Sequence, residues 1–170
     1  MIMKKFFIIF LVVFFVVLTG CSGSGSFREE VTCEDIMNAV VEVTEHPDSD
    51  KIYKKSKNNL DTFGLSLWAD GMYQECSDIE LIDDYAIFVS AGTITYEVAV
   101  LKTKDNGSVN KLEDLMERRK LTLELGDKGM YDPKFDMRIS SSKLQKTGNF
   151  VLLIITDNND AALAAIEKLK

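Results

Sequence analysis

The sequence contains very little histidine, with His46 the single one among 170 residues. A zinc site built from several histidines is therefore excluded within one chain, and a Ser-His-Asp triad would have one candidate base. His46 stands directly before Pro47 in a polar stretch, which favours a solvated loop residue over a general base. The H-E-x-x-H, G-x-S-x-G, Walker A and G-x-G-x-x-G motifs are also missing. We therefore predict no catalytic residues and no cofactor.

Basic residues are also scarce, because 20 lysines and arginines stand against 27 acids and give a net charge of −7. Residues 1–20 hold two of the lysines and no acid, so without them the balance is 18 against 27, or −9. An acidic chain is repelled by phosphate backbones, so nucleic acid is not an expected partner. The acids are spread along the chain, which favours a role in solubility over a dedicated acidic patch.

Two clusters of acids, at residues 48–50 and 157–160, raise the question of calcium binding. An EF-hand loop also needs a glycine and a terminal glutamate at fixed offsets, and neither cluster continues in that way. The second cluster is better explained as a helix cap. We therefore predict no metal site.

The first twenty residues have the pattern of an export signal. Lys4 and Lys5 precede thirteen apolar residues, 6–18, a run too short for a membrane span but suited to a signal-peptide core. The residues that follow, Leu-Thr-Gly-Cys at 18–21, resemble a bacterial lipobox, in which the cysteine is lipidated and becomes the new N-terminus. The alternatives are a plain secretory signal with a chance cysteine, or an uncleaved anchor helix.

This pattern predicts the division of the chain. Residues 1–20 are expected as a lipoprotein signal peptide, 21–30 as lipidated Cys21 with a flexible Gly/Ser linker, and 31–170 as a single α+β domain. Two acyl chains on Cys21 would hold the protein stably on a lipid bilayer. The expected localisation is the extracytoplasmic face of the cell membrane.

Two further cysteines, Cys33 and Cys76, remain after lipidation of Cys21. In an exported protein they could form one disulfide, which would close a loop of 42 intervening residues. Two buried free thiols are an equal alternative, because the sequence does not show whether the two Cα atoms approach each other.

Hydrophobic spacing predicts an α+β fold. Residues 83–90 and 95–103 alternate as an antiparallel hairpin, and the continuously apolar residues 150–155 read as a third, central strand that can lie parallel to one of the first two. About three helices are expected on one face of this small sheet. Thr32 starts the first helix, which ends near His46-Pro47, and the others are residues 109–125 and the segment after Asn158 or Asn159. Residues 48–59, 60–77 and 126–148 are expected as a loop, an irregular segment and a long connection.

Three residues are candidates for an interaction surface. Glu97 lies in the middle of a predicted strand among apolar neighbours, so it either lines a binding surface, faces solvent, or pairs with Lys102, Arg118 or Arg119. Tyr131 and Pro133 flank an aspartate in the long connection. Proline presets a turn there, and long loops in compact domains are often functional.

The order of these motifs resembles a known family. The lipobox, Asp84-Tyr85-Ala86, Glu97, Arg118-Arg119, the Tyr-x-Pro of 131–133, Gly-x-Phe-Val at 148–151 and Thr156-Asp157 together look like a family of Gram-positive lipoproteins known as domain of unknown function 4358. The resemblance covers about residues 31–169. It implies an exported, lipid-anchored protein and carries no catalytic residue.

We therefore expect a membrane-anchored extracytoplasmic lipoprotein with a non-catalytic binding domain, whose partner is a protein or a cell-envelope component. The alternative is a cell-wall hydrolase that uses a pair of carboxylates, since 27 acids are present. A third reading, a small-ligand-binding lipoprotein that feeds a transporter, is disfavoured because such proteins are usually larger and two-lobed.

Overall fold

The computed structural model describes residues 25–47, 50–54, 62–70, 77–126 and 131–170. These residues form one antiparallel sheet of five strands in the order β1-β2-β3-β5-β4, together with five α-helices and two short 3₁₀ helices. The strands are β1 (Asp50–Lys54), β2 (Ile82–Ser90), β3 (Glu97–Thr103), β4 (Lys143–Thr147) and β5 (Phe150–Ile155). The helices are α2 (Cys33–Val41), α3 (Thr62–Asp70), η1 (Ser77–Leu81), η2 (Asn106–Ser108), α4 (Val109–Glu124), α5 (Phe135–Ser141) and α6 (Asn159–Glu167).

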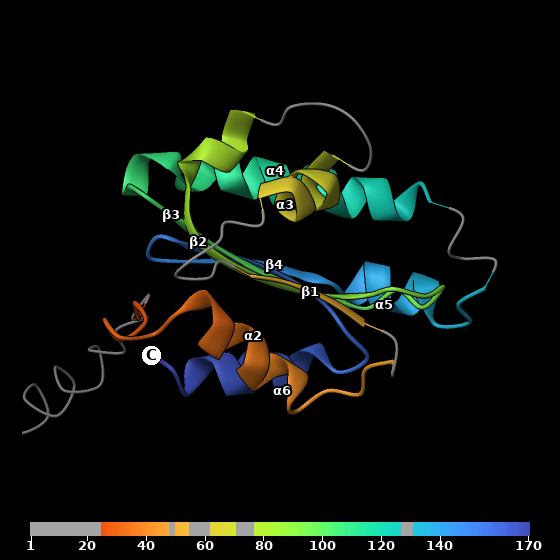
Figure 1. The fold of residues 1–170 in the computed structure, drawn as a ribbon. Coiled ribbons are helices and arrows are strands. Elements are labelled where there is room, and N and C mark those ends of the chain that lie inside the picture. The colour runs from red at the N-terminus through yellow and green to blue at the C-terminus, as the bar shows by residue number, and fades with distance from the viewer. Residues whose placement is uncertain (1–24, 48–49, 55–61, 71–76, 127–130) are drawn as a thin grey trace, which may run out of the picture.

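Helices cover both faces of the sheet (Figure 1). One hydrophobic cluster joins α2 and α6 to Ala86, Phe88 and alternate residues of the neighbouring strands, and the other joins α3 and α4 to Tyr85 and Ile87. The α+β class is confirmed, but the prediction of helices on one face is wrong. The physical reason lies in strand β2, where both alternating sets of side chains are apolar and both require cover.

The sheet also has two more strands than the three predicted. Strand β1 lies where a loop was expected, and β4 and α5 lie within the expected long connection. Both strands are sheet edges, β1 largely exposed and β4 exposed or partly buried except at Thr147, and they lack the apolar alternation that marks an inner strand. Strand β5 lies between β3 and β4 and runs antiparallel to both, with Glu97 opposite Ile155, so the parallel placement is wrong as well.

Predictions of helix starts and strand bounds from local sequence were more accurate than the prediction of how the layers are arranged. Thr32 starts α2 as predicted and forms a capping box with Asp35, and Asn158 caps α6 by accepting a bond from the Ala161 N–H at 3.1 Å. Strand β5 has the predicted bounds. Helix α2 ends at Val41, several residues before His46-Pro47, and helix α3 lies in the segment expected to be irregular.

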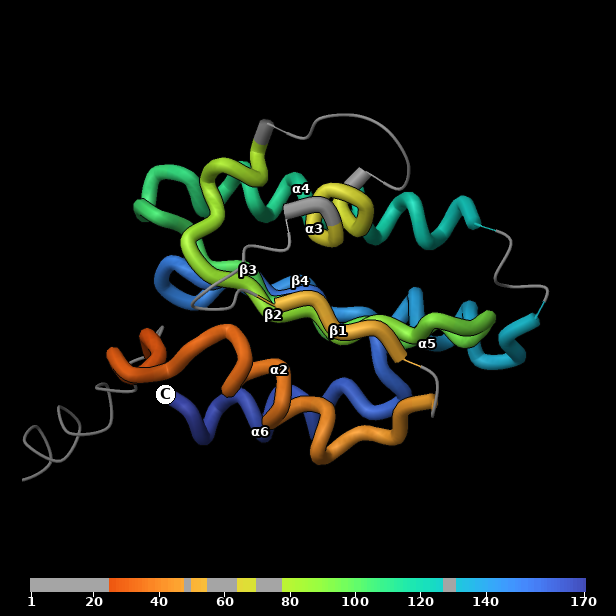
Figure 2. The backbone as a smooth tube through the Cα atoms, viewed as in Figure 1, coloured from red at the N-terminus to blue at the C-terminus, as the bar shows by residue number. Residues whose placement is uncertain are grey.

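Both chain termini of the described fold lie at one end of the molecule, whereas the C-terminal end of α4 and helix α5 lie at the other (Figure 2). At the first end, Phe27 packs edge-on against Phe150 with ring centroids 5.0 Å apart, and the Arg28 N–H donates to the Leu169 carbonyl. Packing therefore extends to Phe27, within the segment expected as a linker. Across the described ranges, we find no helix with the length and apolar character that a membrane span requires.

Candidate functional site

Glu97, one of the three predicted surface residues, lies in the interior. It begins strand β3 and is 1% exposed, facing the layer of α3 and α4. Arg119 of α4 approaches both carboxylate oxygens, with its Nη2 2.6 Å from Oε2 and its Nε 3.1 Å from Oε1. Of the partners considered from the sequence, Arg119 is the one that the structure shows.

Trp68 of helix α3 completes this cluster. Its indole N–H donates to Glu97 Oε1 at 2.7 Å, its backbone carbonyl accepts from Arg119 Nη1 at 3.3 Å, and its ring lies 5.6 Å from the guanidinium carbon. Three residues from three elements thus tie α3 and α4 to the sheet. Burial alone would lower the pKa of Arg119, but the charge and hydrogen bonds of Glu97 raise it above its ordinary value. A carboxylate held in this way has a structural role, because both of its oxygens already accept strong donors.

A second buried network lies under the Tyr131–Lys134 turn. Asp132, 3% exposed, accepts bonds from the Thr95 N–H at 2.8 Å and the Lys134 N–H at 3.0 Å. Arg138 of helix α5 donates Nη1 to both Asp132 oxygens, at 2.7 and 2.8 Å. The turn is therefore bonded to the residues that precede β3 and to its own following helix.

Asp157, just after β5, extends this network. Its carboxylate accepts bonds from the Arg138 Nε and from Lys134 Nζ. Burial alone would raise the pKa of both carboxyls, but hydrogen bonds outweigh it and hold each pKa below its ordinary value. For Asp132 the N–H groups of Thr95 and Lys134 act first and then Arg138, whereas for Asp157 the donors are Arg138 and Lys134.

The side chains on either side of Asp132 point outward. Tyr131 is 63% exposed and Pro133 is exposed, so both remain available as contact residues, whereas Glu97 does not. Sequence reasoning missed Asp132, Arg138 and Asp157 as a unit. The available signal was an aspartate between two turn residues, which by itself indicates only local turn formation.

An open hollow of about 280 Å³ lies beside the Glu97 cluster. Strand β1, helices α3 and α4, and the turn between β2 and β3 surround it. Its lining residues are Lys51, Tyr53, Leu67, Trp68, Val89, Ser90, Ala91, Gly92 and Arg119. It combines two cations with two aromatic side chains, and none of the described residues that line it is acidic.

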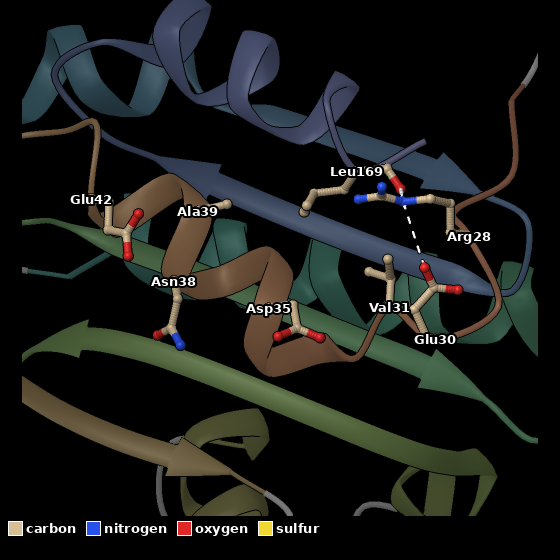
Figure 3. A pocket seen from close by; sticks show the side chains of 8 residues that line it. All are labelled: Arg28, Glu30, Val31, Asp35, Asn38, Ala39, Glu42 and Leu169. Carbon is tan, nitrogen blue, oxygen red and sulfur yellow. Dashed lines mark hydrogen bonds and ion pairs between the residues drawn. The ribbon is translucent and has the colours of Figure 1, made fainter.

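A larger groove of about 440 Å³ runs along α2 and the chain ends (Figure 3). Its walls are Arg28, Glu30, Val31, Asp35, Asn38, Ala39, Glu42 and Leu169. Most of these side chains are solvent-exposed, and Asp35 is already bonded to Thr32 in the capping box. The groove therefore presents a solvated polar surface with no buried polar group directed at a ligand.

The remaining candidates contribute no reactive centre in the described part of the chain. Cys33 is fully buried, and burial, then Asp84, raises the pKa of its thiol well above the usual value. Cys21 and Cys76 lie outside the described residues, so the disulfide and the pair of buried free thiols both stay predictions. His46 is exposed after α2, with its ring edge-on to Phe88 at 5.0 Å. The described ranges contain no group of three or more His, Cys, Asp or Glu side chains suited to a metal ion.

The fold is an antiparallel α+β domain with a helix layer on each face. A family model described as a domain of unknown function (DUF4358) matches residues 78–156. The resemblance indicated by the sequence is thereby confirmed over this segment, which contains Glu97, Arg119, Asp132 and Arg138. No curated protein and no solved structure matches the chain.

Proposed function

We propose that the chain is a lipoprotein, anchored through acylated Cys21 to the extracytoplasmic face of the cell membrane, with a non-catalytic domain that binds a protein or cell-envelope partner. The lipobox pattern supports the anchor. The binding role is supported by one observation above the others. A buried ion-pair network holds the turn that carries exposed Tyr131 and Pro133.

The position of this turn strengthens the proposal. Lys134 pairs with Asp157 just after β5, and Arg138 joins the turn to helix α5, at the end of the fold away from the chain termini (Figure 1). An anchor at the N-terminal end would therefore leave this turn directed away from the bilayer. A rigid, outward-directed aromatic residue binds at a low cost in conformational entropy, which suits a contact residue.

The hydrolase alternative has less support from the geometry. Glycosidases need one carboxyl free to give up a proton and a second free to attack or to activate water. Glu97 and Asp132, the buried carboxylates of the described ranges, are each held by an arginine and further donors. We therefore favour a binding function over hydrolase activity for this domain.

The contact surface predicts a selective loss of partner capture. In-cell cross-linking followed by mass spectrometry should recover a reproducible partner from the unaltered protein, and Tyr131→Ala should reduce that capture at least ~5-fold, as expected for an aromatic anchor. Because Tyr131 is 63% exposed, its replacement should change the free energy of unfolding by less than ~0.5 kcal/mol.

Val43→Ala provides the matched control, since Val43 is apolar, 44% exposed and located after α2 rather than in the Tyr131–Lys134 turn. It should leave capture unchanged. Equal capture by the Tyr131→Ala protein and the unaltered protein would exclude Tyr131 from the contact surface.

The proposed anchor predicts that Cys21 is covalently acylated. Cells fed labelled palmitate should incorporate the label into the unaltered protein and into Cys76→Ser, but not into Cys21→Ser, because the sulfur of Cys21 would carry the lipid. Incorporation that survives Cys21→Ser would show that the lipid is elsewhere. No label in any of the three proteins would remove the lipoprotein proposal.

A further inference from the structure

The hollow beside Trp68 differs in charge from the rest of the molecule. The chain carries 27 acids, yet the described residues that line the hollow include Lys51 and Arg119 and no acid. Because Glu97 already pairs with Arg119, Lys51 supplies the net positive charge of this recess, which attracts anions in a chain that is acidic overall. The electrostatics therefore favour an anionic ligand of small size.

Arg119 retains hydrogen-bonding capacity at this recess. A guanidinium has five N–H donors, and the contacts of Arg119 use its Nε–H, one N–H of Nη2 and one of Nη1. One N–H on each terminal nitrogen is therefore left for a ligand. Lys51, exposed at the rim, makes no ion pair within the described residues, so its ammonium is also available.

The walls of the hollow are suited to an apolar or aromatic group. Trp68, 3% exposed, forms one wall and partly buried Tyr53 another, and Leu67 is 43% exposed at the opening. The indole N–H donates to Glu97, and the backbone carbonyl of Trp68 accepts from Arg119, so this wall is in place before a ligand arrives. A volume of about 280 Å³ lies just below the usual range for drug-sized ligands, which limits the occupant to about one amino-acid residue.

We propose that this hollow binds the carboxylate end of a molecule whose adjoining group is aromatic or apolar. The carboxylate would accept bonds from Lys51 and from the free N–H groups of Arg119, and the apolar group would lie between Tyr53 and Trp68. A peptide C-terminus and a free organic acid share this chemistry. The hollow is distinct from the Tyr131–Lys134 turn, so this proposal can be tested independently of the partner proposed for that turn.

The single tryptophan provides a direct test, since all tryptophan fluorescence of the purified full-length protein comes from Trp68. We expect N-acetyl-L-phenylalanine to change this fluorescence saturably. The neutral amide of the same compound should bind at least ~5-fold more weakly, because charged hydrogen bonds are worth more than neutral ones. Calorimetric titration of both compounds gives a second measurement that does not depend on the emission of Trp68.

Two lysines of the same strand supply a matched pair of variants. Lys51 lines the hollow, whereas Lys54 is paired with Glu34 of α2 on the other side of the sheet. Lys51→Gln should weaken binding of the acid about 3- to 10-fold and leave the amide unaffected. Lys54→Gln, with the same loss of charge, should bind the acid like the unaltered protein.

The tripeptide Gly-Gly-Phe distinguishes the two sources of carboxylate. Tighter binding than N-acetyl-L-phenylalanine assigns the site to peptide C-termini, and weaker binding assigns it to free organic acids. The proposal is overturned by any of three results: no saturable response to any acid by either method, equal affinity for acid and amide, or equal weakening by the two lysine variants.

Discussion

Replacing Arg119 with alanine is expected to lower the free energy of unfolding by about 3–5 kcal/mol, because removal of one partner leaves the other charge buried without compensation. Glu97 is 1% exposed and would lose the donor that contacts both of its oxygens. The Trp68 carbonyl would also lose its bond from Nη1. Urea unfolding followed by circular dichroism measures the loss without relying on the altered environment of Trp68.

Arg118 is the matched control, because it is the preceding residue of the same helix and pairs with Asp78 at 2.8 Å with 53% of its side chain exposed. Arg118→Ala should cost at most about 1 kcal/mol, as is usual for surface pairs. The double variant Glu97→Gln/Arg119→Met should recover at least half of the Arg119→Ala loss, since it removes both charges and keeps an acceptor for the Trp68 N–H. Equal losses for Arg118→Ala and Arg119→Ala would contradict a buried-pair role.

The Glu97–Arg119 pair shows how much of one side chain's environment can be predicted from the sequence. A glutamate in a strand whose own face carries Ala99 and Leu101 marks either a solvated face or an ion pair, and the sequence supplied three cationic partners for it. Selecting Arg119 requires the packing of α4 on that face of the sheet. Helices were expected on only one face of the sheet, and the sequence did not show which face that was, so the burial of Glu97 could not be anticipated.

The same limit explains which strands were predicted. Strands β2, β3 and β5 carry alternating or continuous apolar residues that pack in the core. The bounds predicted for these strands therefore lie within two residues of the observed bounds. The edge strands β1 and β4 contain Lys51, Lys54, Lys143 and Lys146, and charged edges resist further strand pairing. Such a sequence resembles a loop, because what makes it a strand is the hydrogen-bonding partner beside it.

The hydrogen-bond network around Asp132 could not be predicted from the sequence for a different reason. Thr95, Asp132 and Asp157 are far apart in the sequence and meet only when β3, α5 and the end of β5 converge. A Tyr-Asp-Pro sequence predicts a turn whether or not its aspartate is buried. The exposed residues of the turn were therefore identified, whereas the buried residues that hold it were not.

Arg138→Ala should have the second large effect, lowering the free energy of unfolding by about 3–5 kcal/mol at neutral pH. The Arg138 side chain is 9% exposed and contacts two carboxylates, of which the Asp132 side chain is 1% exposed. Its loss should also free the Tyr131–Lys134 turn and reduce partner capture under conditions where the domain stays folded. Lys134→Ala removes an exposed cation from the same Asp157 and should cost at most about 1 kcal/mol.

The pH dependence separates lost charge pairing from lost packing. The pKa values of Asp132 and Asp157 lie below their ordinary values, so these groups stabilise the fold fully above pH ~4 and lose that contribution as pH falls through their folded-state pKa. Without Arg138 both pKa values should rise, and the stability difference between variant and unaltered protein should therefore narrow in acid. Urea unfolding at neutral pH and at pH ~3 measures this difference. A gap of constant size would assign the effect of Arg138 to packing of its aliphatic stem, because dispersion and apolar burial do not titrate.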